Sequence, residues 1–154
     1  MARVSAGLLM YRRRAGALQV LLVHPGGPFW AKKDLGAWTI PKGEVAEGED
    51  LLATARREFE EETSLRPDGP FEPLGSITQK AGKVVHAWAF EGDCDPTAVR
   101  SNTYKVEWPP RSGQWREFPE VDRAEWFSLA DARAKINAAQ AELLARLEEV
   151  VCKA

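Results

Sequence analysis

The sequence has little cysteine, little net charge and no long apolar run. Its two cysteines, Cys94 and Cys152, lie far apart and fit no metal-binding or redox spacing. The formal net charge of −2 provides no electrostatic basis for nonspecific binding to nucleic acid or to an acidic membrane. The longest apolar run near the start, residues 6–11, is too short for the core of a signal peptide or for a membrane span. These features lead us to expect a cytoplasmic protein.

The length and composition are typical of a globular domain. A chain of 154 residues with 44% hydrophobic and 29% charged residues is long enough to bury a core. The sequence contains no internal repeat, low-complexity segment or linker. We therefore expect residues 1–154 to form a single domain.

Apolar runs separated by turn residues predict several strands. Two of them form a predicted hairpin at the N-terminus, and a second hairpin is predicted around Ala81 and Gly82. Residues 92–113 are polar, contain three prolines and predict a long loop. The predicted strands cover residues 3–12, 18–24, 38–40, 71–80, 83–91, 115–118 and 125–127.

Three segments predict helices. Leu52, Ala55 and Phe59 would form an apolar face along residues 50–63. Ser128 and Asn137 each begin a capping-box pattern, which predicts two further helices. Strands, a helix, more strands and then helices predict an α+β sandwich.

Glutamates crowd the second half of the first predicted helix. Glu58, Glu61 and Glu62 are related by i, i+3 and i+4, so their carboxylates project from one face. Such close carboxylates repel one another unless a cation lies among them. Oxygen ligands suit a hard ion such as Mg²⁺, which also binds substrate phosphates. The alternative is a solvated helix face on which neighbouring arginines pair with the acids.

A wider pattern surrounds these glutamates. It consists of a glycine, five residues, Glu, seven residues, and then Arg-Glu-apolar-x-Glu-Glu-x-Gly-apolar, over residues 43–65. With this box the chain resembles a Nudix hydrolase of the MutT-like kind. One position departs from the family pattern, because Ser64 stands where the family has glycine. The matching residues are Gly43, Glu49, Arg57, Glu58, Phe59, Glu61, Glu62 and Leu65.

The resemblance implies a fold and a conformation at Ser64. The fold is a Nudix-type α/β/α sandwich with a mixed central sheet, in which the box forms a loop, a helix and a loop. The family's glycine lies just past the helix, where a left-handed residue is commonly needed. A serine there costs about 1 kcal/mol. We therefore expect an altered helix exit with retained metal binding.

The resemblance also implies roles for the residues of the box. Arg57 would hold Glu49 and orient the helix that carries the metal ligands. The implied cofactor is Mg²⁺, with Mn²⁺ as an alternative. The implied ligands are the backbone carbonyl of Gly43 and the carboxylates of Glu58, Glu61 and Glu62.

Members of the family often recruit one more carboxylate, as a metal ligand or a general base. We choose Glu120, which lies six residues before Trp126 in a segment similar to that of diadenosine tetraphosphate hydrolases. The alternative is an ordinary loop acid. The candidates are Glu107, Glu117, Glu120 and Asp122.

Residues outside the box suggest substrate contacts. Lys42 belongs to a Trp-x-x-Pro-Lys-Gly lead-in similar to that of the diadenosine polyphosphate subgroup, and its ammonium suits a polyphosphate. Aromatic side chains in loops could stack on an adenine, which is worth about 1–3 kcal/mol per base. Core packing is the competing explanation for each aromatic residue, and a plain surface position for each basic one. The chosen substrate contacts are Lys42, Trp30, Tyr104 and Arg111.

The implied activity is metal-dependent hydrolysis of a nucleoside diphosphate linked to another group, by attack of water on phosphorus. A dinucleoside polyphosphate or a nucleoside triphosphate is the preferred substrate, ahead of ADP-ribose, a diphosphoinositol phosphate or capped RNA. A nucleotide-binding sensor without hydrolysis and an isopentenyl diphosphate isomerase are the alternatives. No box carboxylate is missing and neither cysteine has a suitable context, so both alternatives rank lower. We expect a monomer or homodimer without a stable nucleic-acid or membrane partner.

Overall fold

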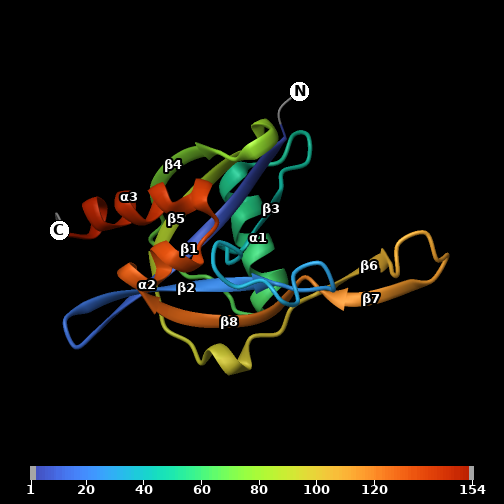
Figure 1. Ribbon diagram of the computed structural model, residues 1–154. Helices are drawn as coiled ribbons and strands as arrows, with labels where there is room; N and C mark the ends of the chain where they lie inside the picture. The colour runs from blue at the N-terminus through green and yellow to red at the C-terminus, as the bar shows by residue number, and fades with distance from the viewer. Residues whose placement is uncertain (1–2, 153–154) are drawn as a thin grey trace.

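A mixed sheet lies between two layers of helices in the computed structural model, which describes residues 3–152 (Figure 1). Strands β1 and β5 pair in parallel, whereas the other pairs of this sheet are antiparallel. The strand order is β4-β5-β1-β2-β8, and β3 pairs with β1 beside that path. The predicted α+β sandwich is therefore confirmed. The strands are β1 (Val4–Arg14), β2 (Ala17–Pro25), β3 (Lys42–Glu44), β4 (Glu72–Thr78), β5 (Val84–Glu91) and β8 (Val121–Ser128).

Strand β1 is buried on both faces and carries the core. Successive side chains of a strand point to opposite faces, so Leu8 and Leu9 enter different clusters. Leu8 packs with Ala55 and Phe59 of helix α1 (Leu51–Thr63). Leu9 packs with leucines of helix α3 (Ala141–Cys152), such as Leu144. The box helix thus covers one face of the sheet, and the C-terminal helix covers the other.

The helices beyond α1 begin at or after the predicted caps. Ser128 accepts a hydrogen bond from the backbone N–H of Asp131 and caps helix α2 (Leu129–Lys135), as predicted. Asn137 also accepts a backbone hydrogen bond, but it caps a short 3₁₀ turn (Ala138–Gln140). Helix α3 begins only at Ala141, so the prediction that Asn137 starts it was wrong in position. None of the helices in residues 3–152 is both long and apolar enough to cross a membrane.

The predicted long loop contains a strand. Strand β6 (Thr103–Glu107) pairs with β7 (Trp115–Pro119) in a separate two-stranded sheet, which Figure 1 shows extending away from the rest of the molecule. The prediction of a loop throughout residues 92–113 was therefore wrong. Short 3₁₀ turns also occur at Lys80–Gly82 and Pro96–Ala98. The predicted strand at residues 38–40 is reduced to isolated bridges, one between Val23 and Thr39.

His24 ties the loop after β2 to the sheet. Its side chain is buried, with Nδ1 2.8 Å from a carboxylate oxygen of Asp122 and Nε2 2.6 Å from the backbone oxygen of Lys33. Buried polar groups need such partners. The loop that leads towards β3 is therefore held at its middle.

Candidate active site

The glutamates of helix α1 differ in their exposure to solvent. Asp50 caps the helix by accepting a hydrogen bond from the backbone N–H of Ala53, 2.9 Å away. Because the apolar face packs on the sheet, Glu62 is drawn inward and is only 8% exposed. The side chain of Glu58 is 17% exposed, whereas that of Glu61 is 39% exposed. The carboxylates therefore extend from the interior to the surface.

Gly43 lies directly against Glu58. Strand β3 pairs with β1 through Gly43 and Ala6, which brings the glycine under helix α1. A Cβ atom at position 43 would lie 2.0 Å from Cδ of Glu58 and 2.3 Å from its Oε2. Only glycine leaves room for the carboxylate in this arrangement.

Arg57 connects three carboxylates. Its Nη1 lies 3.2 Å from Oε1 of Glu58 and 3.1 Å from Oε1 of Glu61, and its Nη2 lies 3.5 Å from Oε2 of Glu49. Glu49 also accepts a hydrogen bond from the backbone N–H of Ala46, 2.8 Å away. The guanidinium therefore links the loop before the helix to two glutamates of the helix, while its role in orienting ligands stays a prediction.

Burial and like charge act together on Glu62. Burial raises the pKa of Glu62 to about 9, assisted by the negative charges of Glu58 and Glu120 and opposed by Lys42. Burial also lowers the pKa of Lys42 to about 8, assisted by the positive charge of Lys83. Lys42 and Glu62 therefore lie within electrostatic reach of each other, and burial is the main cause of both shifts.

The structure brings Glu120 to this acidic group. Glu120 keeps an exposed face, yet partial burial, followed by the charges of Glu58 and Glu61, raises its pKa. Its carboxylate therefore lies within electrostatic reach of the helix although it is distant in sequence. We call Glu58, Glu61, Glu62 and Glu120 the acidic group.

The other acids considered for this position have different partners. Glu107 accepts backbone hydrogen bonds from Arg111 and Gly113 in the turn of the β6–β7 hairpin. Glu117 accepts a hydrogen bond from the hydroxyl of Thr103, 2.8 Å away. Asp122 pairs with His24, as described above. Glu120, by contrast, lies within electrostatic reach of Glu58 and Glu61.

Two of the predicted substrate contacts lie beside the acidic group. Lys42 lies within electrostatic reach of Glu62, and burial, followed by the charge of Glu120, raises the pKa of Tyr104. The hydroxyl of Tyr104 donates a hydrogen bond to the backbone oxygen of Gly26, 2.9 Å away. Tyr104 thus connects the β6–β7 hairpin to the start of the loop after β2.

The other two predicted substrate contacts, Trp30 and Arg111, make no contact with the acidic group among the interactions of the described residues. Trp30 packs within its own loop, with its ring centroid 5.1 Å from that of Phe29. Phe29 is 63% exposed and was not singled out in the sequence, where nothing separates it from a core aromatic. Arg111 belongs to the turn of the hairpin that extends away from the sheet (Figure 1).

Ser64 ends helix α1 in the left-handed conformation, with φ 64° and ψ 17°. Its backbone N–H donates a hydrogen bond to the carbonyl of Glu60, 2.7 Å away. The expected alteration of the helix exit was therefore wrong, because serine itself adopts the conformation that the family position is expected to need.

The donor chemistry fits a hard cation. In the part of the chain that the structure describes, no group of three or more His, Cys, Asp or Glu side chains stands arranged to hold a metal ion. The acidic group nevertheless offers carboxylate oxygens only, and Gly43 leaves a gap for one of them. Burial first, and then the negative charges of Glu58 and Glu120, raise the pKa of Glu62. These residues therefore have suitable donor atoms for Mg²⁺, and their assignment as its ligands stays a prediction.

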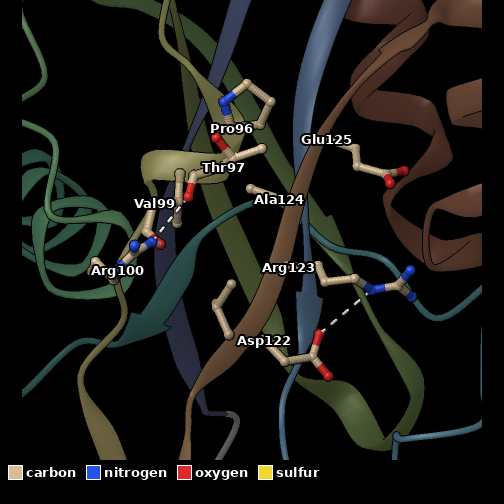
Figure 2. A pocket seen from close by; sticks show the side chains of 9 residues that line it. Pro96, Thr97, Val99, Arg100, Asp122, Arg123, Ala124 and Glu125 are labelled. Atoms are coloured by element: carbon tan, nitrogen blue, oxygen red, sulfur yellow. Dashed lines mark hydrogen bonds and ion pairs between the residues drawn. The ribbon is translucent and has the colours of Figure 1, made fainter.

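Two hollows flank the segment that precedes β6. One of about 420 Å³ lies between the Pro96–Ala98 turn and β8, where Arg100 bends back to nearby carbonyls and Arg123 faces Asp122 (Figure 2). Of the residues considered in the sequence, this hollow is lined only by Asp122, one of the four candidates for the further carboxylate. The other, of about 580 Å³, opens beside α1. Its lining residues are Arg57, Glu60, Glu61, Ser64, Ser101 and Asn102.

Known proteins resemble this chain in sequence and in fold. An RNA pyrophosphohydrolase of Bartonella henselae is 27% identical, over 83% of this chain and 82% of that protein. An asymmetrical bis(5′-nucleosyl)-tetraphosphatase of Rattus norvegicus is 31% identical, over 59% of this chain and 66% of that protein. The structure of a C. elegans Ap4A hydrolase binary complex matches with a TM-score of 0.69 and 25% identity, over 99% of this chain and 100% of that chain. The NUDIX domain family model matches residues 1–147, and the chain therefore belongs to the Nudix hydrolase family.

Proposed function

We propose that this Nudix domain is a Mg²⁺-dependent pyrophosphohydrolase that cleaves a dinucleoside polyphosphate or a nucleoside triphosphate. The observation that carries the proposal is the packing of Glu58 against Gly43, beside the buried Glu62. A helix face built only for solubility would not need a buried carboxylate next to a glycine. Two of the relatives are named for cleaving dinucleoside polyphosphates, which supports the substrate class.

The cation would be held by groups of the box. When bound, Mg²⁺ or Mn²⁺ would neutralise charge on the phosphate oxygens and acidify water for attack on phosphorus. The proposed ligands are the backbone carbonyl of Gly43 and the carboxylates of Glu58, Glu61 and Glu62, with Glu120 as a further candidate.

The side chains around the acidic group would divide the remaining work. Arg57 holds Glu58 and Glu61 in place from the solvent side. Lys42 would contact a phosphate oxygen of the substrate. Glu120, if it is not a ligand, would accept a proton from the attacking water while a new P–O bond forms. The anhydride P–O bond then breaks, and a nucleotide leaves.

A second substrate class is the 5′-polyphosphate end of an RNA. One relative, which matches over 83% of this chain, is named as an RNA pyrophosphohydrolase. The small net charge of −2 provides no broad basic surface for the body of an RNA. We therefore rank this class second and propose that recognition would be confined to the phosphorylated end.

A substrate panel with one active-site variant tests the proposal. Diadenosine tetraphosphate, the nucleoside triphosphates, ADP-ribose, a diphosphoinositol phosphate and RNA with a 5′-triphosphate are incubated with the protein and Mg²⁺, and the products are identified by mass spectrometry. We expect diadenosine tetraphosphate to be cleaved fastest. Glu62→Gln should lower that rate by about a hundredfold or more. Glu60→Gln, a change on the same helix outside the proposed ligands, is the matched control.

Two results would contradict the proposal. Full turnover in Glu62→Gln would remove the assignment of the acidic group as the active site. Tight nucleotide binding without product in either Mg²⁺ or Mn²⁺ would instead favour a sensor domain.

A further inference from the structure

The segment formed by residues 100–102, which we call the clip, pairs with the end of helix α1. The last carbonyls of a helix have no partner within it and need one elsewhere. The backbone N–H of Arg100 donates to the carbonyl of Thr63, 3.1 Å away, and that of Asn102 donates to the carbonyl of Glu61, 2.9 Å away. The clip thus follows the final turn of the helix that carries Glu58, Glu61 and Glu62.

The opposite edge of the clip holds the segment that carries Glu120. The backbone N–H of Glu120 donates to the carbonyl of Asn102, 2.9 Å away. The backbone N–H of Val121 donates to the hydroxyl oxygen of Ser101, 3.0 Å away. Glu61 and Glu120 are therefore linked through one residue, Asn102, which bonds to the main chain of both.

Ser64 adds a side-chain bond to this link. Its hydroxyl donates to the backbone oxygen of Arg100, 2.5 Å away. A non-glycine residue with φ 64° is strained relative to glycine. The hydrogen bond to Arg100 offsets part of that strain. What serine contributes over glycine is therefore the hydroxyl contact with the clip.

The clip is braced from its other side by Arg100. Nη1 of Arg100 donates to the carbonyls of Thr97 and Val99, each 2.9 Å away, so the side chain bends back over its own segment (Figure 2). This shape directs the backbone carbonyl of Arg100, not its guanidinium, towards the helix end. The hydroxyl of Ser64 therefore meets a backbone carbonyl of a residue whose side chain is itself hydrogen-bonded.

We propose that Ser64 is a positioning residue, which acts through the clip to hold Glu120 within reach of Glu58 and Glu61. This proposal rests on the function proposed above for Glu120. It assigns a purpose to the one position at which the box departs from its family pattern. Ser64 itself touches no substrate in this scheme.

Amide hydrogen exchange tests the clip without any assay of activity. Ser64→Gly removes the hydroxyl but retains the left-handed backbone, so the fold should keep its thermal stability. We expect the amides of Glu120 and Val121 to exchange about fivefold faster in Ser64→Gly than in the wild-type protein. Ser112→Ala, which removes a hydroxyl from the hairpin turn, should leave these amides unchanged. Unchanged protection of both amides in Ser64→Gly overturns the proposal, even in a fully active enzyme.

A double-mutant cycle then tests whether the clip works through Glu120. We expect Ser64→Gly to lower kcat on diadenosine tetraphosphate by about fivefold with KM changed by less than about twofold, because only the alignment of a catalytic group is lost. In a Glu120→Gln background the same change should have no further effect. If the fold-decreases in kcat of the two single variants multiply in the double variant, Ser64 does not act through Glu120, and the proposal is overturned. Failure of the proposed function is recognised separately, because it requires full turnover in Glu62→Gln.

Discussion

The carboxylate of Glu58 fills the space that a side chain on Gly43 would need. A Cβ atom there would lie 2.0 Å from Cδ of Glu58 and 2.4 Å from its Oε1, so one of the two groups would have to move. We expect Gly43→Ala to displace the carboxylate and to lower the affinity for Mg²⁺ by about tenfold or more. Isothermal titration calorimetry measures this change.

Gly92→Ala is the matched control for that substitution. A Cβ atom at position 92 would make an ordinary contact with the side chain of Met10, at 3.4 Å. Its Mg²⁺ affinity should equal that of the wild-type protein. Equal affinity in Gly43→Ala would instead argue against a cation at this place.

The acidic group should make stability depend on Mg²⁺. Without a cation the crowded carboxylates repel one another, whereas a ligand that binds only the folded state raises Tm. At a Mg²⁺ concentration about 100 times Kd the gain is about 2.7 kcal/mol. We expect Glu62→Gln to raise Tm in EDTA, because burial raises the pKa of Glu62 to about 9 and the folded state therefore disfavours the ionised form that the unfolded chain adopts, and we expect it to abolish most of the Mg²⁺ effect. Scanning calorimetry with and without Mg²⁺ would contradict this idea if Glu62→Gln kept the wild-type response.

Replacement of Arg57 by lysine should weaken the site although the charge is kept. A guanidinium can contact Glu49, Glu58 and Glu61 at once, whereas an ammonium is a single compact charge. We expect Arg57→Lys to lower Mg²⁺ affinity by about 10-fold to 100-fold with little change in Tm. Arg56→Lys is the control, since Arg56 lies over the ring of Phe71 away from these carboxylates. Similar affinities in the two variants would contradict the role given to Arg57.

Asp34 should contribute to stability in a pH-dependent way. It accepts a hydrogen bond from Lys135 and another from the indole N–H of Trp38, and these bonds, that of Lys135 first, lower its pKa. A lowered pKa in the folded state means that the contribution is present above the unfolded value of 3.8 and is lost as the pH falls through the folded pKa. We expect Asp34→Asn to lower Tm at neutral pH, with the difference shrinking in acid. A pH series of thermal melts measures it, with the exposed Asp68→Asn as control; a difference independent of pH would contradict the assignment.

Helix α1 was predictable because local signals agree there. Leu52, Ala55 and Phe59 set the buried face, and Asp50, the first residue of the predicted helix, caps it. Strand β6 was not predictable on the same grounds. Its residues Thr103–Glu107 are mostly polar and stand between prolines, and the strand is defined by its pairing with β7.

Some residues of the candidate site could likewise be predicted from the sequence, and others could not. The residues of the box follow from spacing along one helix and from the family pattern. The approach of Glu120 depends on the pairing of β8 with β2 and on the clip, which no local pattern encodes. The contact between His24 and Asp122 likewise joins residues 98 positions apart. Such contacts are set by topology, and a single sequence carries no direct signal for them.

The β6–β7 hairpin closes at its own base, because Thr103 pairs with Pro119 and the adjoining Asn102 bonds to the N–H of Glu120. A change in the outer part of the hairpin therefore reaches Glu120 along the chain only through these paired residues at the base. The outer part of the hairpin is therefore structurally separable from the site. We expect replacements within residues 105–117 to leave the position of Glu120 unchanged.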